Sequence, residues 1–336
     1  MNRASRLAAT LIAVLLLMGA AVVVPLPYYL EEPGDALGLG DRLKIGAPTA
    51  TPVDGAFLFT TVTLQPGTLA QLVAAWLDPE TTVIDADQVI PPGQSEAAYF
   101  AHQQLVFEQT ARRAAAVGLR EAGFEIGPER FGGEGALVAG VVSGSAADGA
   151  LLPGDVILAV DGRGIRTDGE LREAIVGRRL RLTVRRAGRL IQVEVQPAPI
   201  SGQSDRPVLG IDVATFKERI DLPVPFEVDS QGIGGPSAGL MIALAVYDIV
   251  DPIDLAGGRR IAGTGTIDLD GTIGEISGIE QKVRAAQRRG ADVFLAPAEQ
   301  LTDAQRGLLA GSRLQVIGVT TFDEALVALR PQAAGP

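Results

Sequence analysis

The sequence predicts an α/β (α+β) fold with a small β-rich domain and one N-terminal transmembrane helix. Strand-like and helix-like runs alternate over residues 205–332, where we expect the larger domain. Short strands separated by tight turns fill residues 126–200, which is typical of a small β-rich domain. An uncharged apolar run from Leu7 to Val24 precedes both. With 336 residues, 47% of them hydrophobic, the chain can form two hydrophobic cores.

Residues 1–27 are predicted to be a cytoplasmic tip and a transmembrane anchor. The run from Leu7 to Val24 has 18 residues, which is the short end of a bilayer span and longer than the apolar core of most cleaved signal peptides. Arg3 and Arg6 precede the run, and no Lys or Arg follows it closely. Because positive charge favours the cytoplasmic side, we expect a single-pass protein of the cell membrane with its catalytic part outside the cytoplasm.

Residues 28–125 are predicted to contain a strand from Ala56 to Leu64 and a long helix from Ser95 to Ala122. The pair Tyr28–Tyr29 is expected at the membrane interface, where aromatic rings are common. This region is either the first part of the catalytic fold, which would make residues 126–200 an insertion, or a free-standing N-terminal region. The sequence leaves these two alternatives open.

The segment 126–200 follows a regular strand-and-turn pattern. Its L-L-P-G-D-V-I-L-A-V-D-G run predicts a strand that ends in a tight turn at Asp161–Gly162. Thr167 is then expected to cap a helix over residues 168–176. Two further strands are expected to close a small barrel, namely Arg181 to Arg185 and Leu190 to Val195.

A glycine-rich turn, G-I-G-G-P-S-A-G, comes just before an apolar helix and carries Ser237, the candidate nucleophile. At the start of a helix, Ser237 would lie among free backbone N–H groups and at the positive end of the helix dipole, which could hold a developing oxyanion. The simpler alternative is that Ser237 only caps the helix. Glycine and proline shape the turn, and small residues leave room beside the serine. These residues are Gly234, Gly235, Pro236, Ala238 and Gly239.

Lys282 is the candidate general base. The chain has no Cys and a single His, His102, so a base for Ser237 is expected to come from another residue type, and Lys is the usual substitute. Only three lysines exist, and Lys44 and Lys217 lie in polar settings. Lys282 instead follows a glycine-rich turn in a predicted helix, where burial could lower its pKa toward neutrality.

The two motifs G-G-P-S-A-G and G-T-G-T-I-D-L-D-G-T-I-G-E-I-S-G-I-E-Q-K together resemble the proteolytic domain of the Lon family. In that family the motif Ser is the nucleophile and the Lys that closes the second motif is its base. The resemblance therefore implies these roles for Ser237 and Lys282, and a dyad-supporting role for Thr264. The sequence departs from the family at Thr266, where a Glu usually stands, and at Glu280–Gln281, where Lys-Glu is common.

Residues 126–200 resemble a PDZ domain, which adds an extended peptide to a sheet edge and holds its carboxylate with backbone N–H groups. Gly132, Gly133 and Gly135 are the expected cradle for that carboxylate, although Glu134 is an unfavourable neighbour. With the Y-Y-x-x-x-P-G and P-P-G-Q-S motifs, nearly the whole chain resembles membrane-anchored Lon-like (S16-type) serine proteases that contain a PDZ domain.

Composition excludes several classes of function. A formal net charge of −11 and a pI near 4.7 argue against a nucleic-acid partner, because phosphate binding needs basic clusters. The sequence has neither the G-x-x-x-x-G-K-[ST] motif of ATP binding nor the H-E-x-x-H motif of zinc peptidases. We therefore expect no ATP, no metal and no other cofactor.

The leading hypothesis is an ATP-independent serine endopeptidase with a Ser-Lys dyad. Its expected substrates are peptides and unfolded or membrane-associated proteins on the outer face of the cytoplasmic membrane, and an oligomer is compatible with the sequence. One alternative is an inactive PDZ adaptor at the cell envelope. Another is a Ser-His-Asp hydrolase that uses His102, since His precedes Ser in some triads.

Overall fold

The computed structural model describes residues 3–46, 55–90, 95–142, 144–200, 204–251 and 253–330. The chain divides into two compact units. The main unit consists of Met1–Glu125 together with Leu222–Pro336, and the inserted unit consists of Ile126–Asp221. The main unit is therefore built from two segments that are far apart in the sequence. The first four residues of the P-P-G-Q-S motif lie outside the described residues.

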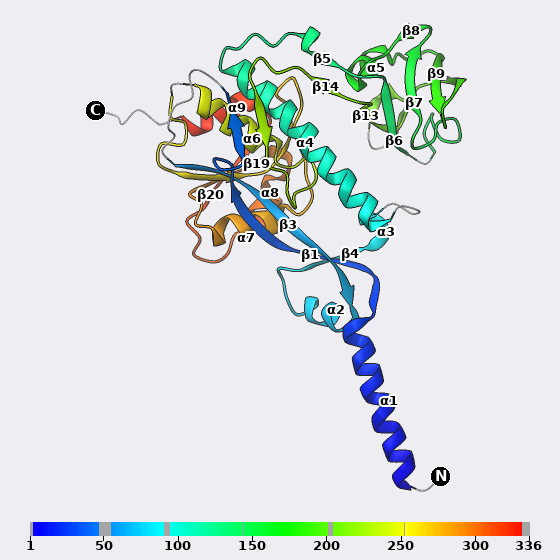
Figure 1. Ribbon diagram of the computed structural model, residues 1–336, viewed down its shortest axis with the longest axis vertical. Helices are drawn as coiled ribbons and strands as arrows, with labels where there is room; N and C mark the ends of the chain where they lie inside the picture. Colours follow the sequence, from blue (N-terminus) through cyan, green and yellow to red (C-terminus); the bar gives the residue numbers. More distant parts are fainter. Residues whose placement is uncertain are drawn as a thin grey trace. The chain divides into compact units, whose positions relative to one another are not determined.

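A six-stranded sheet forms the centre of the main unit (Figure 1). Its strands, in spatial order, are β20 (Gln315–Val319), β19 (Val293–Pro297), β16 (Arg260–Gly263), β3 (Ala56–Thr68), β1 (Pro25–Gly38) and β4 (Thr82–Asp85). β16 runs parallel to β3 and β19, whereas β1 runs antiparallel to β3 and β4. The contact between β3 and β16 thus joins the two segments of the main unit into one sheet.

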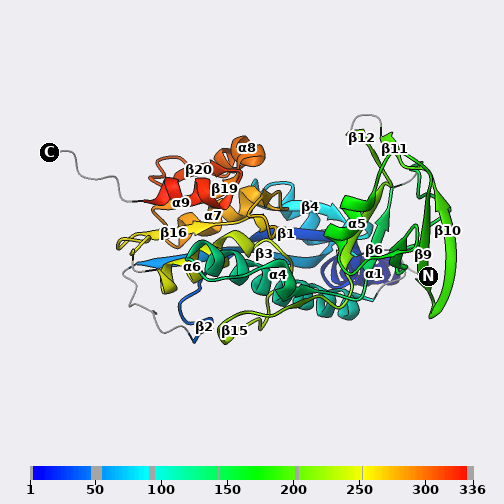
Figure 2. The ribbon, with the colours of Figure 1, turned by 90° about the horizontal axis from the view of Figure 1, so that it is seen from above.

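Helices cover both faces of this sheet (Figure 2). The helices are α4 (Glu96–Glu121), α6 (Gly239–Val250), α7 (Ile279–Arg288), α8 (Leu301–Arg306) and α9 (Phe322–Leu329). α6 packs against α4 on one face, while α7 packs against β1 and β3 on the other. α6 is apolar on every side and almost wholly buried, as expected for a helix in the centre of a domain. Gly118 lets α4 approach α6 closely, because a side chain there would collide with the carbonyl oxygen of Ala243.

Smaller elements complete the main unit. They are β2 (Leu43–Ile45), α2 (Leu69–Ala75), α3 (Ala86–Val89), β15 (Phe226–Val228), β17 (Thr266–Ile267), β18 (Ile273–Gly274) and the short helix η2 (Ala298–Gln300). The predicted strand from Ala56 and the predicted helix from Ser95 are confirmed as β3 and α4. The membrane-interface prediction for Tyr29 is wrong, since Tyr29 lies in β1 between two paired strands and is only 6% exposed.

The N-terminal run forms helix α1 (Arg3–Val23), at one end of the chain in Figure 1. Within the part of the chain that the structure describes, no helix is both long and apolar enough to cross a membrane. The structure therefore gives no support to the predicted transmembrane segment.

The inserted unit is built on a second sheet. In spatial order its strands are β10 (Arg189–Val195), β9 (Leu180–Arg186), β7 (Val156–Val160), β6 (Ala136–Val141) and β13 (Ile211–Thr215), with β8 (Arg163–Gly164) beside β7. Helix α5 (Asp168–Ala174) begins after Thr167, whose hydroxyl accepts from the N–H of Glu170, so the predicted cap is confirmed. The remaining elements are η1 (Pro128–Arg130), β5 (Phe131–Gly132), β11 (Ala198–Ile200), β12 (Ser204–Val208) and β14 (Arg219–Ile220).

The border predicted between the two domains differs from the observed one. The sequence assigns the strand near Ile211 to the catalytic domain 205–332, but β13 pairs antiparallel with β6 and belongs to the inserted unit, which ends at Asp221. The border lies later because partner choice is a long-range property that the local pattern of a strand does not contain.

The P-G-D turn of the inserted unit is held by a buried ion pair. Asp155 is 1% exposed, and its carboxylate accepts from the N–H of Leu152 at 2.9 Å and from the guanidinium of Arg186 at 2.6 Å and 2.8 Å. A carboxylate buried without such partners would be costly. Asp155 therefore has a structural role that explains this part of the sequence pattern.

Candidate active site

Ser237 lies in the turn that precedes α6, and its main chain is fixed from two sides. The N–H of Gly265 donates to the carbonyl oxygen of Ser237 at 2.9 Å, and the hydroxyl of Thr264 donates to the same oxygen at 3.0 Å. Helix α6 starts at Gly239 with Ala238 at its N-cap position, and no side chain caps it. The hydroxyl of Ser237 is therefore not occupied in capping the helix.

Two glycines of this turn are required by its geometry. Gly235 has φ = +85°, a backbone conformation that side chains disfavour. At Gly239 a side chain would come within 2.9 Å of the Cγ2 atom of Ile267, so only glycine lets the start of α6 lie this close to β17. The glycine-rich sequence thus brings the main chain of Ser237 against the Thr264–Gly265 segment.

Thr264 is fully buried and lies just after β16. Its N–H donates to the carbonyl oxygen of Leu295 in β19 at 3.0 Å, which ties it to the central sheet. Its hydroxyl donates to the carbonyl oxygen of Ser237. Thr264 is therefore a support of the serine turn, connected directly to the rigid sheet.

Lys282 projects from the first turns of α7. The residue is only 3% exposed, and its N–H donates to the carbonyl oxygen of Gly278 at 3.0 Å. Burial disfavours the charged ammonium and lowers the pKa of Lys282 to about 8, against the opposing effect of the Glu31 carboxylate. A substantial fraction of this amine is then neutral near physiological pH.

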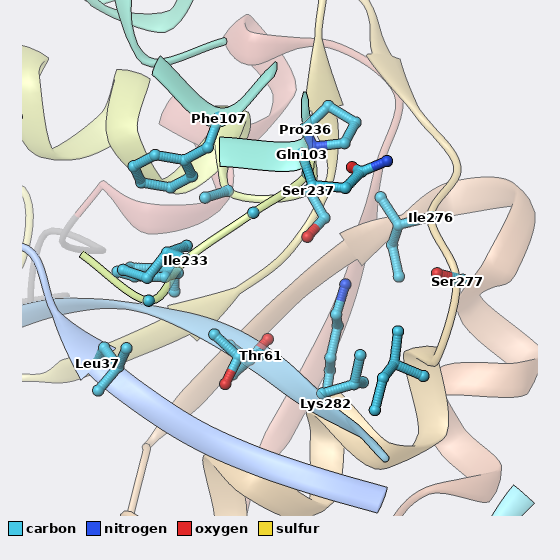
Figure 3. Close-up of a pocket in the computed structure, with 18 of the residues that line it drawn as sticks. Leu37, Thr61, Gln103, Phe107, Ile233, Pro236, Ser237, Ile276, Ser277 and Lys282 are labelled. Carbon is cyan, nitrogen blue, oxygen red and sulfur yellow. The ribbon is translucent and has the colours of Figure 1, made fainter. Parts of the chain in front are cut away.

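Both side chains project into one cleft of about 730 Å³ in the main unit. Figure 3 shows the hydroxyl of Ser237 and the amine of Lys282 pointing toward one another across it. Apolar side chains form much of the lining, namely Leu37, Phe59, Phe107, Ile233 and Ile276. Polar ones are added by Thr61, Gln103 and Ser277. The cleft combines a hydroxyl, an amine and apolar walls.

One wall of the cleft is an unpaired strand edge. β16 pairs with β3 only from Ala56 to Phe59, whereas β1 continues along the opposite edge of β3. Four of the β3 residues that line the cleft, Thr61 to Leu64, lie beyond the end of β16. In the described part of the chain no strand pairs with this edge of β3, which leaves its main-chain groups free for an extended segment.

His102 does not belong to this site. It lies on the exposed surface of α4 and is absent from the lining of the cleft, although Gln103 beside it is present there. The structure does not bring together a Ser-His pair at Ser237. Within the described residues, no three or more His, Cys, Asp or Glu side chains gather as metal ligands would.

The carboxylate cradle predicted in the inserted unit is not supported. The N–H of Glu134 donates to the carbonyl oxygen of Phe216 at 2.8 Å, and the N–H of Gly135 donates to the carbonyl oxygen of Arg166 at 3.1 Å. Gly132 pairs with Arg219 between β5 and β14. At Gly133 a side chain would contact Thr215 and the carbonyl oxygen of Arg166, so this glycine serves close packing. The N–H of Gly135, one of the three expected donors, is therefore already used, and so is that of its neighbour Glu134.

Two family models match the chain. The model of the PDZ domain matches residues 109–196, and the model of the Lon protease (S16) C-terminal proteolytic domain matches residues 178–329. The second match contains Ser237, Thr264 and Lys282.

Curated relatives are Lon proteases. Lon protease 2 of Bacillus subtilis (strain 168) is 29% identical over 118 residues, which are 35% of this chain and 20% of the relative. The Lon protease of Neorickettsia sennetsu is 30% identical over 141 residues, which are 41% of this chain and 17% of the relative. This chain thus spans about a fifth of the length of these relatives.

Among solved structures, the PDZ domain of the SdrC-like protein from Listeria monocytogenes shares 23% identity. The match covers 24% of this chain and 87% of that domain, with a TM-score of 0.22, which is too low to carry an argument about the fold. The two family matches and the Lon relatives, taken together, support a Lon-like serine-type peptidase with a PDZ domain.

Proposed function

We propose that this chain is an ATP-independent serine endopeptidase in which Ser237 is the nucleophile and Lys282 is the general base. The observation that carries the proposal is the placement of the two side chains in one cleft, facing each other, with the lysine buried (Figure 3). A Ser-Lys pair of this kind is a recognised variant of nucleophilic catalysis.

In the proposed reaction, the neutral amine of Lys282 takes the proton of the Ser237 hydroxyl while the oxygen attacks the scissile carbonyl carbon. The resulting ammonium then gives that proton to the departing amine as the peptide bond breaks, leaving an acyl ester on Ser237. Water, deprotonated by the same amine, cleaves the ester and restores the serine. Burial makes this cycle feasible, because it lowers the pKa of Lys282 to about 8.

Negative charge on the substrate oxygen would be stabilised by the start of α6. The N–H groups of Ser237 and Ala238 have no acceptor among the described residues. Both precede Gly239, the first residue of α6, where the helix dipole is positive. These donors are fixed before the substrate arrives, which is the condition for effective oxyanion stabilisation.

The unpaired edge of β3 supports binding of extended peptides. A substrate segment placed along Thr61 to Leu64 could form main-chain hydrogen bonds as an added strand. Leu37 and Ile276, which are partly exposed, would contact apolar substrate side chains in the cleft. Because a folded domain does not offer a free strand, we infer that the substrates are peptides or unfolded proteins.

An inactive adaptor would not need a buried lysine that faces a serine, so the geometry favours catalysis. Recruitment of protein substrates by the inserted unit is part of the proposal. Location at the outer face of the cell membrane, and the formation of an oligomer, stay predictions from the sequence.

Labelling with a serine-directed fluorophosphonate tests the proposed function. Peptide mapping should find the label on Ser237, and the labelling rate should rise with pH through a midpoint of about 8. The labelling rate should rise with pH because Lys282 acts as a base only when it is deprotonated. The rate should therefore be lost as the pH falls through the pKa of Lys282. A label on another residue, or a rate that is constant between about pH 6 and 10, would refute the proposal.

Replacing Thr264 by Val should reduce activity without abolishing it. The change removes one of the two donors to the carbonyl oxygen of Ser237 and leaves the N–H of Gly265 in place. Because the oxygen keeps one donor, the loss is that of a single hydrogen bond, about 0.5 to 1.5 kcal/mol, so we expect kcat to fall by about 2- to 10-fold. Thr264→Ser retains the hydroxyl and should recover most of the rate. Equal losses in the two variants would instead indicate a packing effect of the methyl group.

A further inference from the structure

Glu31 is a buried acidic residue that the proposed reaction does not use. It lies in β1, opposite Leu64 of β3 and Thr82 of β4, and is 5% exposed. Burying a carboxylate is unfavourable unless nearby groups compensate for the loss of water. The carboxyl group of Glu31 therefore needs polar or charged groups close to it.

The start of α7 is one such compensation. A Cβ atom built at Gly278, which has φ = +66° and is the N-cap residue of α7, would lie 2.7 Å from the Oε1 atom of Glu31. The carboxyl group therefore rests against the first turn of this helix, where unpaired N–H groups and the helix dipole favour negative charge. Glycine at 278 leaves the space that the carboxyl group fills.

A second contact joins α7 to β4, the strand that pairs with β1 at Glu31. The side-chain amide of Gln281 donates to the hydroxyl of Thr82 at 2.7 Å, and both residues are neighbours of the pair formed by Glu31 and Lys282. The position of Lys282 relative to Glu31 is thus set by the packing of α7 on β1 and β4.

Glu31 and Lys282 affect each other's charge. Burial raises the pKa of Glu31, and the lysine opposes this rise, while the glutamate opposes the fall in the pKa of Lys282. Other charged groups of this helix, of the elements beside it and of the cleft are Glu32, Asp35, Glu80, Glu275, Glu280, Arg284, Arg288 and Arg306. Glu280 is paired with Arg284 and Arg306, and Glu80 is paired with Arg288. Among all of them, Glu31 is the charge that acts on Lys282.

We propose that Glu31, whose carboxyl group lies at the start of α7 one helical turn before Lys282, is a positioning residue that stabilises the ammonium form of Lys282 between the two proton transfers. Its catalytic consequence rests on the proposed function, whereas the interaction between the two side chains does not. Without Glu31 the amine would be a weaker base, which is less able to take the proton from the serine hydroxyl.

The small number of lysines allows a direct test. With three lysines in the chain, a sample labelled with ¹³C at the lysine Cε gives three titration curves. Lys44 and Lys217 have side chains that are 81% and 62% exposed and act as internal references. In Glu31→Gln, the midpoint of Lys282 should fall by about 1 pH unit or more, as expected for the loss of a nearby opposite charge. The reference signals should be the same in both proteins.

Two further variants complete the test. Glu31→Asp keeps the charge but withdraws it by one methylene group, so its midpoint should lie between those of the native protein and Glu31→Gln. Glu32→Gln removes the next carboxyl group along β1, on the opposite face of the strand, and should leave the Lys282 signal in place. An unchanged Lys282 midpoint in either folded Glu31 variant would overturn the proposal.

The rate of the fluorophosphonate reaction then tests whether the effect of Glu31 on Lys282 reaches catalysis. The midpoint of the labelling rate in Glu31→Gln should move to lower pH by the same amount as the Lys282 signal, with a lower plateau. A shifted signal without any labelling of Ser237 in the native protein would establish the effect of Glu31 on Lys282 and refute the proposed function. The two failures are therefore distinguishable.

Discussion

Ser237→Ala should reduce peptide cleavage by at least about 10⁴-fold, the scale observed when a serine nucleophile is removed. The loss is expected because, among the residues that the structure describes, no other hydroxyl lies at the start of α6 opposite Lys282 (Figure 3). Folding should be retained, because the bonds from Gly265 and Thr264 go to the main chain of Ser237. Cleavage of a fluorogenic peptide and thermal unfolding measure the two properties separately.

A matched control is present in the same cleft. Ser277→Ala removes another hydroxyl from the lining and should cost far less activity than Ser237→Ala. If Ser277→Ala were inactive and Ser237→Ala retained turnover, the nucleophile would be misassigned.

Lys282→Arg is expected to lower kcat by about 10³-fold or more. Guanidinium keeps the positive charge but does not lose its proton at accessible pH, so it cannot serve as the base. His102→Ala should leave kcat/KM close to the native value, since His102 is exposed and outside the lining of the cleft. Near-native turnover in Lys282→Arg together with an inactive His102→Ala would establish the histidine-based alternative.

A neutral replacement at the same position separates catalysis from stability. The pKa of Lys282 falls from 10.5 to about 8 on folding, so the folded state binds fewer protons and becomes less stable as the pH drops through this window. Lys282→Met removes that cost and should raise the free energy of unfolding at pH 7 by up to about 3 kcal/mol. An inactive protein that is more stable than the native one would mark Lys282 as a residue retained for chemistry.

The sequence was sufficient to propose the reacting residues because few alternatives existed. One histidine, no cysteine and three lysines leave little choice of base for Ser237. Local chemistry likewise predicted the cap at Thr167 and the strand from Ala56, because both depend on residues close by in the chain.

Features that depend on distant pairing could not be predicted. Glu31 is separated from Lys282 by about 250 residues, and no local signal shows that E-E-P-G lies beneath the helix of the second motif. For the same reason, the N–H groups of Glu134 and Gly135 could not be known to bond to Phe216 and Arg166. Burial and partner choice, which decide the charge state and free donors of a residue, arise only from the whole fold.

The pairing of β3 with β16 also determines the order of events during synthesis. The hydroxyl of Thr60 donates to the carbonyl oxygen of Gly263 at 3.2 Å, across 203 residues of chain. β3 can pair with β1 as soon as both have been synthesised, but its second partner, β16, is made only after the inserted unit. The inserted unit, whose sheet contains only its own strands, can fold first and bring the two segments closer. The proposed dyad can therefore assemble only after Lys282 has been synthesised and β16 has joined β3, so we expect the proposed peptidase to be inactive during the earlier stages of synthesis.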